Sequence, residues 1–206
     1  MSTLSSCQQS CYEHQKWTVV NGTFTGDLNE RMPRLEALKL FCDFEYNPQK
    51  LNAAIVRRLS NNNGTILLFE SGKFVMIGIK NLEEATQLGT CLVGTLHGIG
   101  LDCHLSDVWC KNLVVKTLLG DNFVRNLWSI LDTGPVTTLH SACKKQDIRF
   151  VFEPELFPSI KFYTKNPKSC VCIFRKGTCI ITGITDLSGV SCIIACVESL
   201  LNNGNV

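Results

Sequence analysis

Apolar residues occur in short runs separated by turn-forming residues, and this pattern is clearest between Phe152 and Gly183. Pro154 and Pro158 stand at its start, β-branched and aromatic residues fill the runs, and turn residues separate the runs at 165–168 and 176–177. The pattern predicts a turn followed by three consecutive short strands.

The same pattern occurs earlier in the chain. Residues 66–79 align with residues 171–184 without a gap, and both segments carry a phenylalanine, two glycines and a final isoleucine at equivalent places. Phe44-Glu45 likewise corresponds to Phe152-Glu153. An internal repeat on this scale fixes the architecture, because each copy must fold in the same way.

Each copy is predicted to contain an opening strand, a helix, further strands and a closing helix. In the first copy we expect strands at 17–25, 43–47, 52–59, 65–70 and 74–79, with helices at 33–42 and from the Asn81 cap to His97. In the second copy we expect strands at 107–118 and 147–152 before the three described above, with helices at 122–131 and from 186 or 188 to 201. An Asn-rich hairpin turn is expected at 61–64. Residues 133–145 have no counterpart in the first copy and are expected to form an inserted loop.

These elements predict an α+β fold in which helices cover one face of an antiparallel sheet in each copy. Strands at 170–174 and 179–184 are apolar at nearly every position. A sheet that is apolar on both faces but covered on one exposes a hydrophobic surface, which usually indicates a binding site. The alternative is a more completely buried sheet.

The composition suits a folded core: the chain has 206 residues, of which 45% are hydrophobic and 18% charged. Residues 1–16 are polar and are expected to form a flexible tail, followed by repeats at 17–104 and 105–206. No apolar run reaches transmembrane length and no signal peptide is apparent, so we expect a soluble intracellular protein.

Twelve cysteines are present, most of them in apolar runs where a reduced cysteine acts as a small hydrophobe. Two alternatives remain open at this stage. Zinc ligands could come from Cys103-His104 with Cys110, from Cys192 with Cys196, or from Cys7, Cys11 and His14, but none of these groups has zinc-knuckle spacing. A reactive cysteine could act with His97, His104 or His140, but no nucleophile motif is present. We therefore expect no metal, no cofactor and no enzymatic activity.

The net charge is only +2. Up to Cys103 the chain has 9 basic and 10 acidic residues, and after it 11 basic and 8 acidic residues. This balance lacks the basic footprint of most proteins that bind nucleic acid. If nucleic acid is the partner, apolar contacts must supply much of the affinity, and the dependence of binding on salt should be shallow.

Three segments carry a family resemblance, namely Glu-Tyr-Asn-Pro at 45–48, Phe-Glu-Ser-Gly-Lys at 69–73 and Glu-Pro-Glu-Leu-Phe-Pro at 153–158. They resemble the TATA-binding protein family, in which two repeats form a saddle-shaped curved antiparallel sheet with helices on its convex face. The resemblance covers roughly residues 17–201. It implies a protein that binds the minor groove of A·T-rich promoter DNA and bends it.

The resemblance also implies which residues contact DNA. Phe157 and Phe174 match the pair of phenylalanines that wedge into base steps in the second repeat, whereas the first repeat has Phe69 and Leu51. Asn21 and Asn112 match amides that meet minor-groove acceptors. The alternative for either asparagine is a structural role in a turn or at a strand end, and Gly22 favours it more for Asn21 than for Asn112. The remaining base-contact positions match Thr182, Val75, Ile180, Val114 and Leu67, while Ile77, Thr23 and Cys172 depart from the family pattern.

The basic residues that contact DNA phosphates in the family are matched less completely in this chain. Arg58 or Arg57, Lys73 and Lys80 match in the first copy, but the equivalent positions in the second copy are Tyr163, Thr178 and Thr185. The second copy offers four other basic residues as substitutes, namely Lys161, Lys165, Arg175 and Lys176.

The resemblance further implies partners and a location. Glu153, Glu155 and Leu156 match the surface that the family offers to TFIIB, so we expect TFIIB-type and TFIIA-like factors, RNA polymerase and a nuclear location. When DNA is absent, we expect that two copies of the protein can form a homodimer through the exposed sheet. The alternative function is an adaptor of the same family that assembles transcription factors without reading TATA sequences.

Overall fold

The computed structural model describes residues 16–40, 44–57, 59, 64–134, 136–166 and 168–202. They divide into two compact units. The first unit comprises the described residues of Val20–Leu113, and the second comprises the described residues from 114 to 202 together with residues 16–19. Strands β1 (Trp17–Asp27) and β6 (Val108–Leu118) each contribute residues to both units. The compact units therefore do not end where the sequence repeats end.

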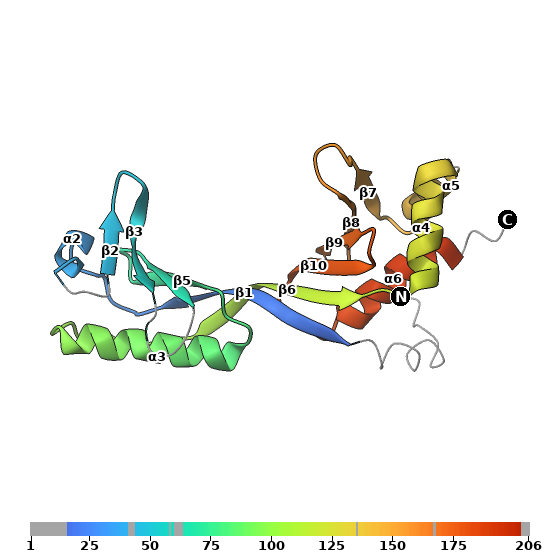
Figure 1. The fold of residues 1–206 in the computed structure, drawn as a ribbon. Helices are drawn as coiled ribbons and strands as arrows, with labels where there is room; N and C mark the ends of the chain where they lie inside the picture. The colour runs from blue at the N-terminus through green and yellow to red at the C-terminus, as the bar shows by residue number, and fades with distance from the viewer. Residues whose placement is uncertain are drawn as a thin grey trace. The chain divides into compact units, whose positions relative to one another are not determined.

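The elements of the first unit after β1 are α2 (Leu35–Leu38), β2 (Phe44–Asn47), β3 (Leu51–Arg57), β4 (Thr65–Leu68), β5 (Lys73–Ile77) and α3 (Leu82–Gly98). Its strands form a sheet in the order β2-β3-β4-β5-β1. Figure 1 labels β2, β3 and β5 of this sheet and helix α3. Neighbouring strands are antiparallel. Helix α3 approaches this sheet closely at Gly89, where an added Cβ would lie 3.6 Å from the ring of Phe74.

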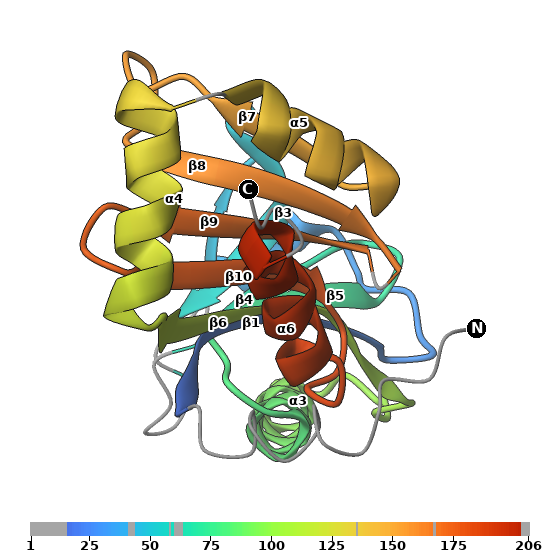
Figure 2. The same cartoon turned by 90° about the vertical axis from the view of Figure 1, so that its right-hand side faces the viewer.

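The elements of the second unit after β6 are α4 (Asp121–Thr133), α5 (Val136–Lys145), β7 (Arg149–Phe152), β8 (Ser159–Lys165), β9 (Lys168–Phe174), β10 (Thr178–Ile184) and α6 (Val190–Asn202). Its strands repeat the arrangement of the first unit in the order β6-β10-β9-β8-β7. Helices α4 and α6 lie over one face of strands β8, β9 and β10 (Figure 2). Trp128 of α4 meets the ring of Phe152 in β7 edge to face, with centroids 5.4 Å apart.

Glycines at equivalent places in the two copies share an unusual backbone conformation. Gly72 and Gly177 have φ angles of +83° and +82°, and Gly78 and Gly183 have φ angles of +91° and +89°. Residues with a side chain rarely adopt these φ angles, so glycine is the residue that allows both turns to form in the same way. The gap-free alignment of the two segments is therefore matched in backbone geometry.

Most of the predicted elements are present, although their ends shift by a few residues. Asn81 caps α3 as predicted, because its side-chain Oδ1 accepts a hydrogen bond of 2.8 Å from the backbone N–H of Glu84. Helix α2 is shorter than the predicted helix at 33–42, of which 41–42 lie outside the described residues. The predicted tail at 1–16 and turn at 61–64 also lie almost entirely outside them.

The prediction of an inserted loop at 133–145 was wrong, because this stretch contains α5. Leu139 and Cys143 are four residues apart, so both lie on one helical face, and both are buried. Lys144 and Lys145 stand in the last turn, where cations stabilise the helix dipole. None of the helices within the described ranges is both long and apolar enough to cross a bilayer.

Candidate nucleic-acid interface

In the first unit, side chains on the sheet face opposite the core align across four strands. Thr25 pairs with Val75, Val75 with Leu67, and Leu67 with Ile55. All four are partly exposed, whereas residues next to them along the strands, such as Phe24 and Phe74, are buried. The structure therefore places two predicted base-contact residues, Val75 and Leu67, in one row on a partly exposed, largely apolar face.

The second unit carries an equivalent row. Ile180 pairs with Cys172, and Cys172 pairs with Lys161. These side chains are also partly exposed, and the residues that alternate with them, such as Cys179 and Ile181, are buried. This alternation confirms, for the described strands, the prediction of a sheet that is apolar on both faces but deeply buried on only one.

Asn21 lies inside β1 and not in a turn or at the end of the strand. Its Oδ1 accepts a hydrogen bond of 3.1 Å from the backbone N–H of Gly78. That bond uses the acceptor of the amide, whereas a contact with adenine N3 or thymine O2 would use its donor. Asn112 and Val114 are partly exposed on β6, and Thr182 is partly exposed on β10.

The predicted wedge residues of the second unit are close together. The rings of Phe157 and Phe174 have centroids 5.9 Å apart, and Phe157 is 40% exposed. The Nζ of Lys161 lies 4.3 Å from the centre of the Phe157 ring. An ammonium over an aromatic face is an attractive cation–π contact, so Lys161 helps to hold Phe157 in place.

The first unit has no equivalent aromatic pair among the ring contacts of the described residues. Leu51 begins β3, pairs with Asn47 and is 38% exposed. Phe69 is partly exposed and lines a cavity of about 520 Å³ together with Trp109, which is 48% exposed. Trp109 was not predicted as a site residue, and an exposed aromatic residue on a strand is the signal that could have pointed to it.

The predicted phosphate contacts of the first unit differ in their surroundings. Arg57 lies 3.8 Å from Glu45, with both side chains exposed. Lys73 and Lys80 are exposed, and Arg58 lies outside the described residues.

Two of the four basic substitutes in the second unit are engaged with acids. Arg175 donates two hydrogen bonds of 2.7 and 2.8 Å to Asp132, and its guanidinium lies 4.4 Å from the ring centre of Trp128. These hydrogen bonds hold the pKa of the Asp132 carboxyl below its usual value. Lys165 pairs with Asp147 at 2.6 Å. Lys161 instead lies over Phe157, and Lys176 is exposed.

The segment Glu153–Phe157 forms a tight turn. The backbone N–H groups of Leu156 and Phe157 both donate to the carbonyl oxygen of Glu153, at 3.0 Å each. Glu153 and Glu155 are exposed, and Leu156 is 80% exposed. An apolar side chain held so far out of the core can contact another protein.

The cysteines of strands β9 and β10 differ in burial, because Cys179 is buried whereas Cys170 and Cys172 are partly exposed. The Sγ atoms of Cys170 and Cys172 are 3.9 Å apart, and burial raises the pKa of the Cys170 thiol to about 11. Burial also raises the pKa of Cys179 to about 12, so both thiols favour the protonated form at neutral pH. Among the described residues no three potential ligands are grouped to hold a metal ion. The candidate ligands Cys7, Cys11 and His14 lie outside the described residues.

A protein-family model described as "Transcription factor TFIID (or TATA-binding protein, TBP)" matches residues 16–97 and 125–203. This chain belongs to that family. TBP-family proteins are DNA-binding transcription factors and not enzymes, which excludes the alternative of a cysteine-dependent enzyme.

Individual relatives agree with the family match. The chain is 26% identical over 189 residues to TATA-box-binding protein 2 of Entamoeba histolytica, covering 90% of this chain and 82% of that protein. It is 30% identical over 140 residues to the TATA-box-binding protein of Methanothrix thermoacetophila, covering 68% and 69%. The solved structure of Methanococcus jannaschii TBP superposes with a TM-score of 0.72 at 22% identity, covering 91% of this chain and 99% of that one. The superposition supports the TBP fold.

Proposed function

We propose that this protein binds A·T-rich, TATA-like promoter DNA in the minor groove, bends it, and recruits TFIIB-type factors and RNA polymerase. The observation that carries the proposal is the matching rows of partly exposed apolar side chains on the two units. Val75 and Leu67 stand in one row, and Ile180 and Cys172 stand at the equivalent places in the other. Such a surface suits the floor of a minor groove better than a phosphate backbone.

Bending would come from the aromatic pair. A ring inserted into a base step costs a few kcal/mol of stacking, and the bent DNA recovers this by contacting more apolar protein surface. Phe157 and Phe174 are close enough to act on one step, and Lys161 supports Phe157. In the first unit Phe69 and Leu51 would act on a second base step.

Preference for A·T pairs would come from Asn21 and Asn112. The hydrogen bond from Gly78 fixes the orientation of the Asn21 amide, so its donor group is already positioned before DNA binds. The guanine amino group is absent from A·T pairs, so an amide donor and a flat apolar floor both favour them.

The partner surface would be the turn at Glu153–Phe157, with Leu156 as its apolar contact and Glu153 and Glu155 as its charges. TFIIB-type and TFIIA-like factors are the partners that the family suggests, and promoter binding in a eukaryote places the protein in the nucleus. When DNA is absent, self-association through the exposed sheet would bury the same apolar rows.

A second candidate is an adaptor that assembles transcription factors without reading TATA sequences. It is favoured by Leu51, which offers an aliphatic side chain where the family has an aromatic wedge, and by Ile77, which is 39% exposed where a threonine would assist base contacts.

Energy transfer across an end-labelled duplex tests the two candidates. We expect transfer to rise when the protein is added to a TATA-like duplex and to stay unchanged with a G·C-rich duplex of equal length. No change with either duplex would overturn the proposal and favour the adaptor. An equal rise with both would retain bending and overturn the preference for A·T pairs.

A further inference from the structure

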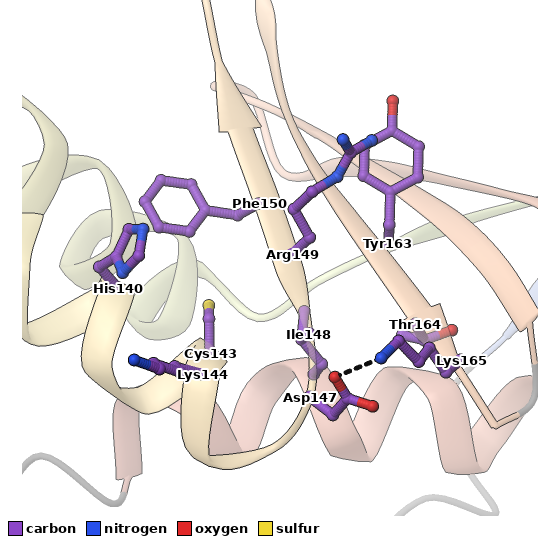
Figure 3. Close-up of a pocket in the computed structure, with 10 residues that line it drawn as sticks. All are labelled: His140, Cys143, Lys144, Asp147, Ile148, Arg149, Phe150, Tyr163, Thr164 and Lys165. Carbon is purple, nitrogen blue, oxygen red and sulfur yellow. Dashed lines mark hydrogen bonds and ion pairs between the residues drawn. The ribbon is translucent and has the colours of Figure 1, made fainter.

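The guanidinium of Arg149 lies on the ring of Tyr163, with its central carbon 4.5 Å from the ring centre (Figure 3). The two residues are direct partners across strands β7 and β8. Arg149 itself is exposed, while Tyr163 is partly buried beneath it. The stacking restricts the side chain of Arg149, which nevertheless remains exposed to solvent.

Arg149 and Tyr163 continue a row of the sheet that contains a predicted base contact. Tyr163 pairs with Cys170, and Cys170 pairs with Thr182. Side chains that are opposite each other in successive strands share a face, so Arg149 is on the same face as Thr182. Strand β7 is the last strand in the order, and Arg149 is therefore at the outer end of this row.

The charges around Arg149 leave a local excess of positive charge. Arg149 lines a cavity of about 460 Å³ together with Lys144, Lys165 and Asp147. Figure 3 shows Asp147 directed to Lys165, with which it forms the ion pair of 2.6 Å. Lys165 and Asp147 compensate each other, so Arg149 and Lys144 are the cations that remain in the cavity lining.

We propose that Arg149, held on the ring of Tyr163, binds a backbone phosphate of the DNA. This inference rests on the proposed function. In the second copy, the position equivalent to Arg57 or Arg58 is Tyr163, which carries no charge. Arg149 supplies the cation that is missing there. A planar guanidinium can donate two parallel hydrogen bonds to a phosphate, and a side chain already restricted by stacking loses little entropy when it does so.

An acidic peptide offers similar chemistry, but DNA fits the position better. The row runs from Thr182 to Arg149, that is, from a predicted base contact to the outer edge of the sheet. Minor-groove floor and backbone phosphates follow each other in the same order in DNA. A carboxylate-rich partner would have no reason to align with the base-contact row.

Binding to a TATA-like duplex at several salt concentrations tests the proposal with Arg149→Gln. We expect affinity to fall about three- to tenfold and the slope of log K against log salt to become shallower by about 0.9, as one phosphate contact is lost. Arg125→Gln is the matched control, because Arg125 is exposed on α4 and donates to Asn122 at 2.8 Å. It removes the same charge and should leave the slope unchanged.

Two further variants separate charge from stacking. Tyr163→Arg combined with Arg149→Gln returns a cation to the row and should restore the slope. Arg149→Lys keeps the charge without the planar fork and should retain the slope at reduced affinity. Thermal melting of each variant before the assay identifies any loss of affinity that arises from unfolding.

Each outcome decides the matter. A wild-type protein that binds the duplex while Arg149→Gln leaves slope and affinity unchanged overturns the phosphate site and retains the proposed function. If, in addition, Arg149→Gln abolishes binding of a polyglutamate peptide, the site belongs to an acidic protein partner. A wild-type protein that binds no duplex overturns both proposals.

Discussion

The phenyl rings of Phe157 and Phe174 meet at an angle of 62°, with their centres 5.9 Å apart. The first ring follows the turn that begins at Glu153, and the second ends strand β9 opposite Ser159. The segment just before β8 and the end of β9 thus present a pair of aromatic side chains side by side, because β8 and β9 are neighbouring strands. The pair is the feature on which bending is expected to depend.

Replacing Phe174 with alanine should reduce DNA bending more than it reduces stability. The ring is partly exposed, so its loss should lower the free energy of unfolding by only about 1–2 kcal/mol. Energy transfer in the bent duplex should decrease clearly at saturating protein. Chemical denaturation and the transfer assay on the same preparation measure the two effects.

Phe162→Ala is the matched control, because Phe162 is fully buried in the neighbouring strand β8. Its removal should destabilise the protein by about 3–5 kcal/mol. If Phe174→Ala destabilises the protein as much as Phe162→Ala does, then Phe174 belongs to the core and the wedge role is wrong.

Asn21→Asp should weaken binding to A·T-rich DNA by at least about tenfold. Aspartate can still accept the hydrogen bond from Gly78, but it has no donor for a minor-groove acceptor and adds a negative charge. The melting temperature should change little. Asn122→Asp is the control, since Asn122 accepts a bond from Arg125 on α4 and the change adds the same charge. Equal weakening by both variants would attribute the effect to net charge alone.

Leu156→Ala should weaken binding of a TFIIB-type factor to the protein–DNA complex by about tenfold, without altering DNA bending. Because Leu156 is 80% exposed, the free energy of unfolding should change by less than about 0.5 kcal/mol. A gel-shift titration with the factor measures the effect. Leu40→Ala, at a leucine that is 85% exposed in the first unit, should have none. Unchanged recruitment with Leu156→Ala would remove this turn as the partner surface.

Asp132→Asn should lower the melting temperature slightly at pH 7, on the order of 1–3 °C, because the pair with Arg175 is exposed and screened by solvent. The folded-state pKa of Asp132 is lowered, so the pair stabilises the protein above the unfolded-state pKa of about 3.9. The contribution is lost as pH falls through the lowered pKa. Melting curves between pH 7 and pH 2 should therefore converge for the two proteins.

Asp107→Asn serves as the comparison for that series, because Asp107 is exposed and takes part in none of the ion pairs among the described residues. A difference between wild type and Asp132→Asn that persists at the lowest pH would show that Asp132 acts through packing and not through its charge.

Much of the fold was predictable because it depends on residues close in sequence. The apolar runs predicted the strands, Asn81 and the two glutamates after it predicted the start of α3, and the repeated glycines predicted turns that share the same φ angles. Helix α5 was predictable in principle as well, since Leu139 and Cys143 have helical spacing. It was missed because the first copy contains no equivalent segment.

The candidate site could be predicted only in part. Phe157, Phe174, Asn21 and Asn112 follow from a repeat and from a family resemblance that are visible in the chain. Which basic residues form ion pairs could not be predicted from the sequence. Arg175 pairs with Asp132, 43 residues away, and Lys165 pairs with Asp147, 18 residues away. Charge pairing depends on distance in space, and no local pattern in the sequence encodes it.

The sequence by itself determined the two-copy architecture, the short apolar strands and the turns that glycine permits. These follow from steric limits and periodicity that act between near neighbours. Only the tertiary structure decided which residues share a row, and above all that Arg149 lies on Tyr163. Strand register places them together, and register is set by the turn between β7 and β8 and by the core packed beneath the sheet.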